Sequence, residues 1–402
     1  MAGVYIHIPF CEQFCTYCNF YSVKGGAYRG KFIQALKREI EIKKDLVRGA
    51  ATIYFGGGTP SVLPAEQLRE ILQTVLACDK ESLNHICNSE DTLLSRDTPR
   101  LSRDTFTDVS REITLEVNPD DITPAYARTL VESGFNRVSM GVQSFIDDHL
   151  AWMNRRHRAA HAVEAFHTLR SAGFRNISLD LIFGYSLLSM EQWQYNLQQI
   201  IELAPNHISA YQMSVEPGSA LSAKLQKREY NLPSDQFCWE QYRMLQQMLE
   251  AGGYEQYEIS SFARKGFYSR HNRAYWNKTP YVGLGPAAHS YDGGLRRFWN
   301  TASVKKYCDF YNENDSSDFS AVGVCDSEIL SAEDVFNESV MLGLRTVEGF
   351  DVSNVDPALL NQIHSAVEKE ILLGNLIAND SALQIPRDKL FISDSIIREL
   401  MV

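Results

Sequence analysis

Short apolar runs recur through the first half of the chain, and longer stretches with apolar residues at helical spacing separate them. The runs have the length of buried strands, whereas stretches such as 28–44 and 124–133 have the length of amphipathic helices. The expected strands are residues 4–8, 52–55, 113–117, 137–140, 177–182 and 207–211. This alternation predicts an α/β fold, a partial (β/α)6 barrel whose sites form at the carboxyl ends of the strands.

The pattern is interrupted between residues 77 and 111. The chain is polar there, and LSRDT at 94–98 returns at 101–105. We interpret residues 79–110 as a surface insertion, with a phosphorylation or partner segment as the alternative. The expected domains are a barrel at 1–220, a connecting segment at 221–300 and a C-terminal domain at 301–402.

Composition narrows the class of protein. The 402 residues are 44% hydrophobic and 22% charged, which is enough for a large core and more than one domain. The net charge of -11 argues against a general nucleic-acid or anionic-membrane binder. No apolar run reaches the roughly 18 residues of a membrane helix, and no signal peptide is recognisable, so a cytoplasmic protein is expected.

Three of the eight cysteines lie close together near the start, at Cys11, Cys15 and Cys18. A reducing cytosol disfavours disulfides and suits an iron-sulfur cluster. Three thiolates occupy three irons of a four-iron cluster and leave the fourth iron open to another ligand. A structural zinc site is the alternative, but no second Cys or His pair follows at zinc-finger distance.

The string YIHIPFCEQFCTYC at residues 5–18 resembles the cluster loop of the radical S-adenosylmethionine (SAM) superfamily, specifically its coproporphyrinogen III dehydrogenase-like family. The resemblance extends through most of the chain. It implies a TIM-like barrel of radical SAM type, with a [4Fe-4S] cluster on Cys11, Cys15 and Cys18. It also implies SAM at the open iron, where an electron from the cluster cleaves the sulfonium.

Several strand ends carry residues that match the SAM contacts of that family. The GGGTP run at 56–60 lets backbone groups approach a ligand closely, although most such runs are ordinary turns. Asp180 lies in an apolar strand, where a ligand or a salt bridge to Arg155 has to compensate its burial. The alternatives for Glu116 and Gln143 are an exposed edge charge and a helix-start residue. The resemblance assigns SAM contacts to Tyr5, Gly57, Gly58, Thr59, Glu116, Gln143, Arg155 and Asp180, and contact with a second SAM to Tyr17.

Two features separate the branches of this family. Coproporphyrinogen dehydrogenases carry a fourth cysteine two residues after the third, where this chain has Phe20. HNRAYW at 271–276 matches the His-Asn-x-x-Tyr-Trp motif of the HemW-type branch, in which the histidine is implicated in heme binding. His271 is therefore the predicted heme residue, since imidazole is a common axial ligand. A hydrogen-bonded structural histidine is the alternative.

Two further strings bear on the site. In YVGLGPAAHS at 281–290, residues Ala287, Ala288 and His289 either line the porphyrin or SAM site or form a packed loop. GYSLLS at 184–189 stands where the family has a Gly-Leu-Pro-Gly-Gln type turn, so a looser turn beside Asp180 is expected.

The last hundred residues resemble the small helical, winged-helix-like domain of the family. Helices are expected at 332–345 and 357–370, followed by short apolar pieces at 376–378, 383–385 and 390–392. The acidic balance of the chain favours a domain that covers the site or docks partners over one that binds DNA.

The predicted function is that of a heme chaperone, which binds the cluster, SAM and heme and transfers heme to an acceptor protein. An oxygen-independent coproporphyrinogen III dehydrogenase is the alternative from the enzyme class. A regulatory or electron-transfer iron-sulfur protein without SAM chemistry is the third. A membrane-associated acceptor and a homodimer are both left open, and no catalytic residue is assigned.

Overall fold

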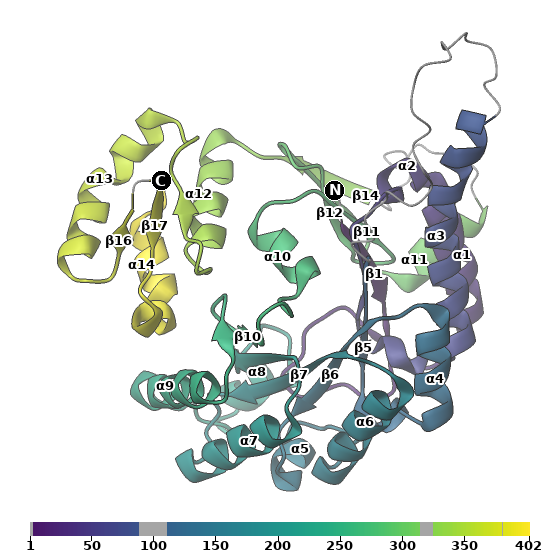
Figure 1. Ribbon diagram of the computed structural model, residues 1–402, viewed down its shortest axis with the longest axis horizontal. Coiled ribbons are helices and arrows are strands. Elements are labelled where there is room, and N and C mark those ends of the chain that lie inside the picture. Colours follow the sequence, from purple (N-terminus) through teal and green to yellow (C-terminus); the bar gives the residue numbers. More distant parts are fainter. Residues whose placement is uncertain (1–2, 88–110, 314–324, 380) are drawn as a thin grey trace, which may run out of the picture.

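The strands expected from the sequence all form, and they lie side by side in one curved parallel sheet (Figure 1). They are β1 (Gly3–Ile8), β4 (Thr52–Gly57), β5 (Glu112–Val117), β6 (Arg137–Gln143), β7 (Asn176–Phe183) and β8 (His207–Gln212), each paired in parallel with the next. The computed structural model describes residues 3–87, 111–313, 325–379 and 381–402. The predicted α/β partial barrel is confirmed.

Shorter strands, which the sequence pattern did not reveal, extend both edges of this sheet. On the β1 side follow β11 (Tyr281–Leu284), β12 (His289–Tyr291), β13 (Arg296–Asn300) and β14 (Cys325–Ile329). On the β8 side follow β10 (Ser261–Ala263) and β9 (Glu255–Gln256). Within the described residues the sheet thus has 12 strands and runs past residue 300. The domain limits at 220 and 300 stay a prediction.

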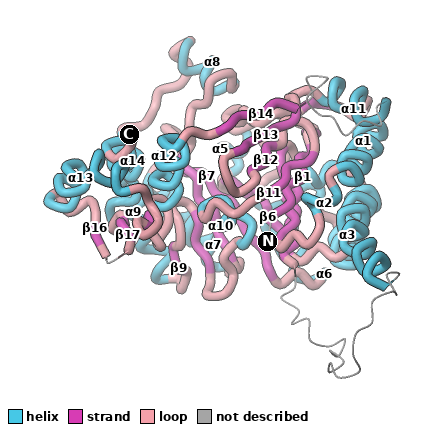
Figure 2. Tube along the Cα trace, turned by 90° about the horizontal axis from the view of Figure 1, so that it is seen from above, coloured by secondary structure: helices cyan, strands magenta, loops and turns pink. Residues whose placement is uncertain are grey.

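Helices cover the outer face of the sheet (Figure 1). They are α1 (Arg29–Ile42), α2 (Lys44–Val47), α3 (Ala65–Cys87), α4 (Pro124–Ser133), α5 (Asp147–Trp152), α6 (Ala159–Ala172), α7 (Met190–Leu203) and α9 (Asp235–Ala251). Side-chain caps mark the first residues of some of these helices. The Thr123 hydroxyl caps α4, and Ser189 forms a capping box with Gln192 at α7. Figure 2 shows α1 beside α11 (Val304–Glu313) at one end of the molecule.

The inner face of the barrel is polar. In β5, Ile113, Leu115 and Val117 belong to the apolar core. Because side chains alternate along a strand, Thr114 and Glu116 point to the opposite face. The same alternation in the neighbouring strands places polar groups inside the barrel, below the edge where the strands end.

Helix α3 continues into the segment expected to be an insertion. It ends at Cys87, so the start of the expected 79–110 segment is helical. The reason is local, because Lys80, Glu81 and Leu83 are good helix formers. The rest of the insertion, residues 88–110, lies outside the described residues.

The C-terminal part forms a smaller unit beside the open side of the sheet (Figure 1, left). It comprises α12 (Ala332–Gly343), α13 (Pro357–Leu372), α14 (Ser393–Glu399) and a three-stranded antiparallel sheet of β15 (Phe350–Asp351), β17 (Ala382–Gln384) and β16 (Ile377–Ala378). Both predicted helices are present, and the expected segment 390–392 falls in a 3-10 helix, Arg387–Ile392. The arrangement agrees with the predicted winged-helix-like domain.

A short helix, α10 (Arg270–Trp276), lies between the barrel and this C-terminal unit (Figure 1). Its first turn is held by Glu112, whose carboxylate accepts hydrogen bonds from the backbone N-H groups of Arg270 and His271 at 3.2 and 3.0 Å. Within the described part of the chain, no helix has both the length and the apolar content needed to span a bilayer.

Candidate functional site

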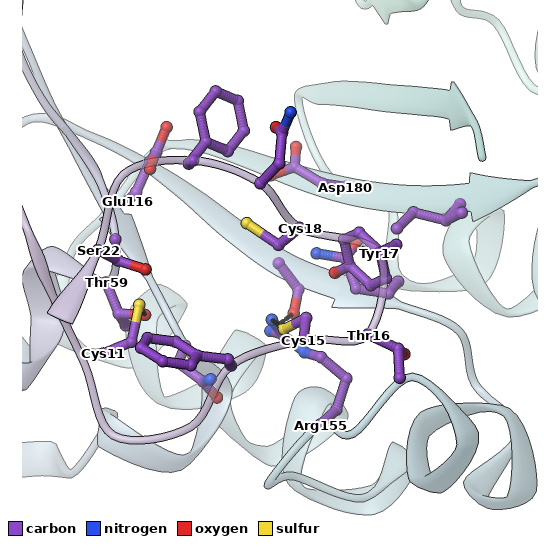
Figure 3. A pocket seen from close by; sticks show the side chains of 18 of the residues that line it. Cys11, Cys15, Thr16, Tyr17, Cys18, Ser22, Thr59, Glu116, Arg155 and Asp180 are labelled. Atoms are coloured by element: carbon purple, nitrogen blue, oxygen red, sulfur yellow. Dashed lines mark hydrogen bonds between the residues drawn. The ribbon is translucent and has the colours of Figure 1, made fainter. Parts of the chain in front are cut away.

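A cavity of about 990 Å³ opens at the carboxyl ends of the strands, beside the loop that carries the three cysteines (Figure 3). We call it the cluster-loop cavity. The predicted residues that line it are Cys11, Cys15, Tyr17, Cys18, Gly57, Gly58, Thr59, Glu116, Gln143, Arg155 and Asp180. Two predicted residues, Tyr5 and His271, are not among the lining residues. The fold thus brings most of the predicted set into one place.

Backbone contacts hold the cysteine loop against the barrel. Cys11 ends the short strand β2 (Phe10–Cys11), which pairs with β3 (Val23–Lys24) where the loop returns. Midway along the loop, the Thr16 N-H donates to the Met153 carbonyl at 3.1 Å, and the Thr16 carbonyl accepts from the Leu221 N-H at 2.8 Å. Leu221 belongs to α8 (Ala220–Gln226). The loop is therefore anchored on both sides of the cavity.

The three thiols influence one another and have polar neighbours. Burial raises the pKa of Cys11 and Cys18, and the nearby thiols raise it further. The Thr59 hydroxyl donates to Cys11 Sγ at 3.5 Å, and Arg155 Nη1 donates to Cys15 Sγ at 3.4 Å. These donors favour the thiolate, which is the form that binds iron.

The donor set fits a four-iron cluster. Three thiols on one loop beside a cavity leave one iron of such a cluster facing that cavity. Phe20, at the position of the fourth cysteine of the dehydrogenases, is 70% exposed and offers no metal-binding atom. Within the described residues, no group of three or more His, Cys, Asp or Glu side chains is placed to hold a single metal ion.

The glycine run packs directly against the cysteine loop. A Cβ atom on Gly58 would lie 2.7 Å from the Phe10 carbonyl oxygen and 3.1 Å from Cys11 Sγ. The Gly58 N-H donates to the Ile8 carbonyl at 2.9 Å, and the Thr59 N-H donates to the Phe10 carbonyl at 2.8 Å. The run therefore seats the first cysteine, in addition to lining the cavity.

Glu116 lies among donors near the end of β5. Its carboxylate accepts from the Tyr54 hydroxyl at 2.8 Å and from the Gly57 N-H at 3.2 Å. Burial raises its pKa to about 7, although both hydrogen bonds favour the ionised form. Glu116 is thus a cavity acceptor, and the alternative of an exposed edge charge does not describe it.

Asp180 on β7 is held by serines. The Ser139 hydroxyl lies 3.2 and 3.3 Å from its two carboxylate oxygens, and Ser178 donates to one of them at 3.4 Å. Burial raises the pKa of Asp180 to about 6, against the effect of these hydroxyls. The salt bridge to Arg155, weighed from the sequence, does not form within the described residues, because Arg155 contacts Gly141 and Cys15 instead.

Gln143 and Arg155 meet the cavity at an irregular strand end. Gln143 ends β6 with a left-handed backbone, φ 66°, next to a register shift that starts at Gly141. It is a strand residue, and the helix-start alternative does not hold. Arg155 Nη2 donates to the Gly141 carbonyl at 2.7 Å, whereas its buried Nε has no hydrogen-bond partner in the described structure. A buried guanidinium nitrogen without an acceptor suits an anionic ligand group.

Of the two predicted tyrosines, Tyr17 lines the cavity and Tyr5 does not. Tyr17 lines the cavity beside Cys15 and Arg155 (Figure 3), and burial raises its pKa. Tyr5 lies deeper, where its hydroxyl is 3.1 Å from His7 Nδ1 and its ring stacks on Tyr54. SAM contacts by these two residues stay predictions.

His271 is enclosed in the barrel and is only 2% exposed. Its Nδ1 lies 2.8 Å from the Thr52 hydroxyl, and its Nε2 lies 2.9 Å from the Tyr275 hydroxyl. The ring also stacks on Tyr54 at 4.9 Å between centroids. Heme ligation by His271 stays a prediction, and it requires one of these hydrogen bonds to open.

Sequence reasoning missed Arg137, the first residue of β6. Its side chain is 1% exposed, and its Nε and Nη1 have no hydrogen-bond partner in the described structure. Its charge lowers the pKa of Glu116, Asp180 and His271. The available signal was a charge at the start of an apolar run. Tyr211, near the end of β8, and Met213, just after it, line the cavity and were also missed.

The family model of the Radical SAM superfamily matches residues 5–199. The protein named heme chaperone HemW in Bacillus subtilis (strain 168) is 34% identical over 353 residues, which cover 87% of this chain and 84% of that protein. This chain belongs to the HemW-type radical SAM family. The heme chaperone HemW of Escherichia coli (strain K12) is 33% identical over 291 residues, 71% of this chain and 69% of that one. Membership implies a [4Fe-4S] cluster and SAM as cofactors, and it confirms the predicted branch.

A solved structure agrees with the fold. Coproporphyrinogen III oxidase (HemN) from Escherichia coli, a radical SAM enzyme, matches with a TM-score of 0.75 and 20% identity over 100% of this chain and 90% of its own. At this level of identity the likeness concerns the fold alone. The likeness supports a barrel followed by a C-terminal unit. It does not decide between a chaperone and an enzyme.

Proposed function

We propose that this protein is a heme chaperone, which holds a [4Fe-4S] cluster on Cys11, Cys15 and Cys18, binds SAM in the cluster-loop cavity and transfers heme to an acceptor protein. One observation carries the proposal. A single cavity gathers the three thiols and the polar strand ends, in a chain that belongs to the HemW-type family. The name heme chaperone, which several relatives bear, supports the heme part.

The chain's own groups bind and orient SAM in this proposal. When bound, the cluster supplies one iron without a protein ligand and a single electron. Glu116 and Asp180 are acceptors for the ammonium and hydroxyl groups of SAM. Arg155, whose Nε lacks a protein partner, is the donor for the carboxylate. The left-handed turn at Gln143 presents an amide to the same space.

Phe20 favours the chaperone over the decarboxylating enzyme. It lies on the cavity wall two residues after Cys18, with 70% of its surface exposed. An aromatic ring cannot replace a thiolate ligand. This chain thus lacks the fourth cysteine that marks the dehydrogenase branch.

The test uses anaerobically reconstituted protein. One sample receives heme, and a parallel sample receives coproporphyrinogen III, SAM and a reductant. We expect stoichiometric heme binding by absorption and no formation of protoporphyrinogen. Turnover to protoporphyrinogen would make the protein an enzyme, whereas absence of heme binding in the wild type would remove the chaperone function.

A further inference from the structure

Arg137, the first residue of β6, is a cation buried inside the barrel without an acceptor. Its side chain is 1% exposed, and neither Nε nor Nη1 has a hydrogen-bond partner in the described structure. It also forms no ion pair within the described residues. Burying a guanidinium group without such partners destabilises a fold. The position of this residue therefore needs an explanation other than packing.

Strand register places Arg137 below the two carboxyl groups of the cluster-loop cavity. Arg137 pairs with Thr114 on β5, and Glu116 lies two residues further along that strand. Gly141, four residues after Arg137 on β6, pairs with Asp180 on β7. Side chains two or four positions apart point to the same face of a sheet. Arg137 therefore shares the inner face of the barrel with Glu116 and Asp180, one layer below the first and two layers below the second.

Most titratable groups around Arg137 are neutral at neutral pH. Two histidines, His207 on β8 and His271 on α10, carry no charge, because burial and the charge of Arg137 lower their pKa. The nearby tyrosines keep their protons, because burial raises their pKa; they are Tyr5, Tyr54, Tyr211, Tyr257 and Tyr275. The guanidinium group is thus the lasting positive charge of this layer.

The other charged groups near this layer have contacts of their own. Glu112 accepts hydrogen bonds from two backbone N-H groups of α10. Glu258, between β9 and β10, accepts from a backbone N-H of its own turn at 3.0 Å. Arg155 donates to a carbonyl of β6 and to the cysteine loop. Glu116 and Asp180 are therefore the carboxyl groups on which the buried guanidinium acts.

We propose that Arg137 is a positioning residue for SAM, whose buried charge keeps Glu116 and Asp180 as carboxylates that accept the ammonium and hydroxyl groups of SAM. This inference rests on the proposed function and adds the group that prepares the cavity for its ligand. Arg137 acts through the two carboxylates, because it does not line the cluster-loop cavity itself.

The two carboxyl groups titrate in the range where such a charge has an effect. Burial raises the pKa of Glu116 to about 7 and that of Asp180 to about 6, and the charge of Arg137 lowers both values. Without Arg137 both pKa values are higher, so a smaller fraction of each group is ionised at neutral pH. SAM binding that needs the carboxylates then requires a higher pH.

The experiment measures SAM affinity from pH 6 to pH 9 by equilibrium dialysis with anaerobically reconstituted, full-length protein. Arg137→Met and Arg137→Gln remove the charge, and Arg137→Lys retains it. We expect both charge-removing variants to bind SAM severalfold more weakly at pH 7, with the midpoint of the profile about one pH unit higher. Wild-type affinity is expected to return at pH 9, and Arg137→Lys is expected to keep the wild-type midpoint. Infrared spectra follow the C=O band of the protonated carboxyl groups, and Glu116→Gln identifies the contribution of Glu116.

Thermal unfolding separates this role from a structural one. Because Arg137 Nε and Nη1 have no partners in the described structure, Arg137→Met is expected not to lower the unfolding temperature. Arg170→Met on α6 is the matched control, since Arg170 donates to the Arg175 carbonyl at 2.8 Å and to Asn206 Oδ1 at 2.7 Å and does not line the cavity. This control is expected to lower the unfolding temperature and to leave the SAM profile unchanged.

The outcomes separate this inference from the proposed function. A wild-type pH profile in Arg137→Met, or loss of the fold in both charge-removing variants, overturns the role of Arg137 and leaves SAM binding by the wild type standing. A shifted profile with an intact fold supports the role. A wild-type protein that binds no SAM at any of these pH values overturns both the role of Arg137 and the SAM part of the proposed function.

Discussion

Two carboxyl groups face the cluster-loop cavity, and both hold their protons to higher pH than in water. The pKa of Glu116 is about 7 and that of Asp180 about 6, with burial as the main cause in each. The buried charge of Arg137 works against this shift at both positions. Burial and the charge of Arg137 together leave the pKa values of both carboxyl groups near neutral pH.

SAM affinity is expected to rise with pH between 6 and 8. A raised pKa means that Glu116 is mostly protonated at pH 6 and mostly ionised at pH 8, and only the ionised form is a full acceptor. If binding needs that form, the gain is about tenfold. Equilibrium dialysis with the reconstituted protein measures it. Glu116→Gln is expected to flatten the profile, and equal wild-type affinities at both pH values contradict the prediction.

The Cys18→Ala variant is expected to lose the cluster. Two thiolates leave a second iron without a protein ligand, and such a site loses iron. Iron analysis and visible absorption after anaerobic reconstitution give the readout. Cys78→Ala is the matched control, since Cys78 is buried on α3 away from the cavity. Full iron in Cys18→Ala rules this cysteine out as a ligand.

Among the elements that hold the cysteine loop, the turn after β4 has little tolerance for change. We expect Gly58→Ala to displace the cysteine loop, because its Cβ would lie 2.7 Å from a backbone oxygen that cannot move alone. Cluster content after reconstitution is expected to fall severalfold, as measured by iron per chain.

The control for this prediction is Gly30→Ala in α1. An added Cβ at Gly30 meets no atom within 4 Å. Removing backbone freedom from a helix is expected to stabilise the protein by about 0.5–1 kcal/mol in urea unfolding. Normal iron content in Gly58→Ala would show that the loop adapts to the extra methyl group.

The elements that the sequence predicted are those with long regular patterns. The six barrel strands could be found because each has several apolar residues, consecutive or alternating, over the length of a strand. Strand β12, His289–Tyr291, and strand β13, Arg296–Asn300, could not, because they are short and mix polar with aromatic residues. Their pairing depends on contacts with a sheet edge that is distant in sequence.

The looser turn expected at 184–189 is compensated by tertiary contacts. The Gly184 N-H donates to Gln241 Oε1 at 2.9 Å, and the Tyr185 hydroxyl lies 2.9 Å from His149 Nδ1. Both contacts come from segments far along the chain, so local turn chemistry could not reveal them. The turn beside Asp180 is therefore held in place.

Across the whole molecule, depth in the barrel decides which of the predicted site residues line the cluster-loop cavity. Glu116 and Asp180 were found because the ends of parallel strands gather at one edge of the sheet. Tyr5 and His271 do not line the cavity. The Tyr5 hydroxyl lies next to His7 instead, and the ring nitrogens of His271 lie next to the hydroxyls of Thr52 and Tyr275. Motif spacing does not encode this depth.

The C-terminal unit is joined to the barrel through Arg387. Its Nε lies 3.2 Å from Gln256 Oε1, and its Nη2 donates to the Gln246 carbonyl at 3.1 Å. Arg387→Ala is expected to increase hydrogen exchange in α13 and β17 without lowering the iron content, because none of these residues lines the cluster-loop cavity.

Arg398→Ala is the control for this loosening, since Arg398 is exposed on α14. It is expected to exchange like the wild type. An Arg387→Ala variant with unchanged exchange would mean that the other contacts hold the unit, among them the hydrogen bonds from the Ile259 N-H to the Arg345 carbonyl and from the Val347 N-H to the Tyr257 carbonyl.

The backbone on either side of His289 leaves no space for added side chains. A Cβ atom on Gly283 would lie 2.1 Å from the His289 carbonyl oxygen, and one on Gly285 would lie 2.5 Å from the His7 carbonyl oxygen. Neither oxygen can retreat without breaking the sheet. Any side chain at these two glycines would therefore cost the pairing that joins β11 and β12 to the barrel.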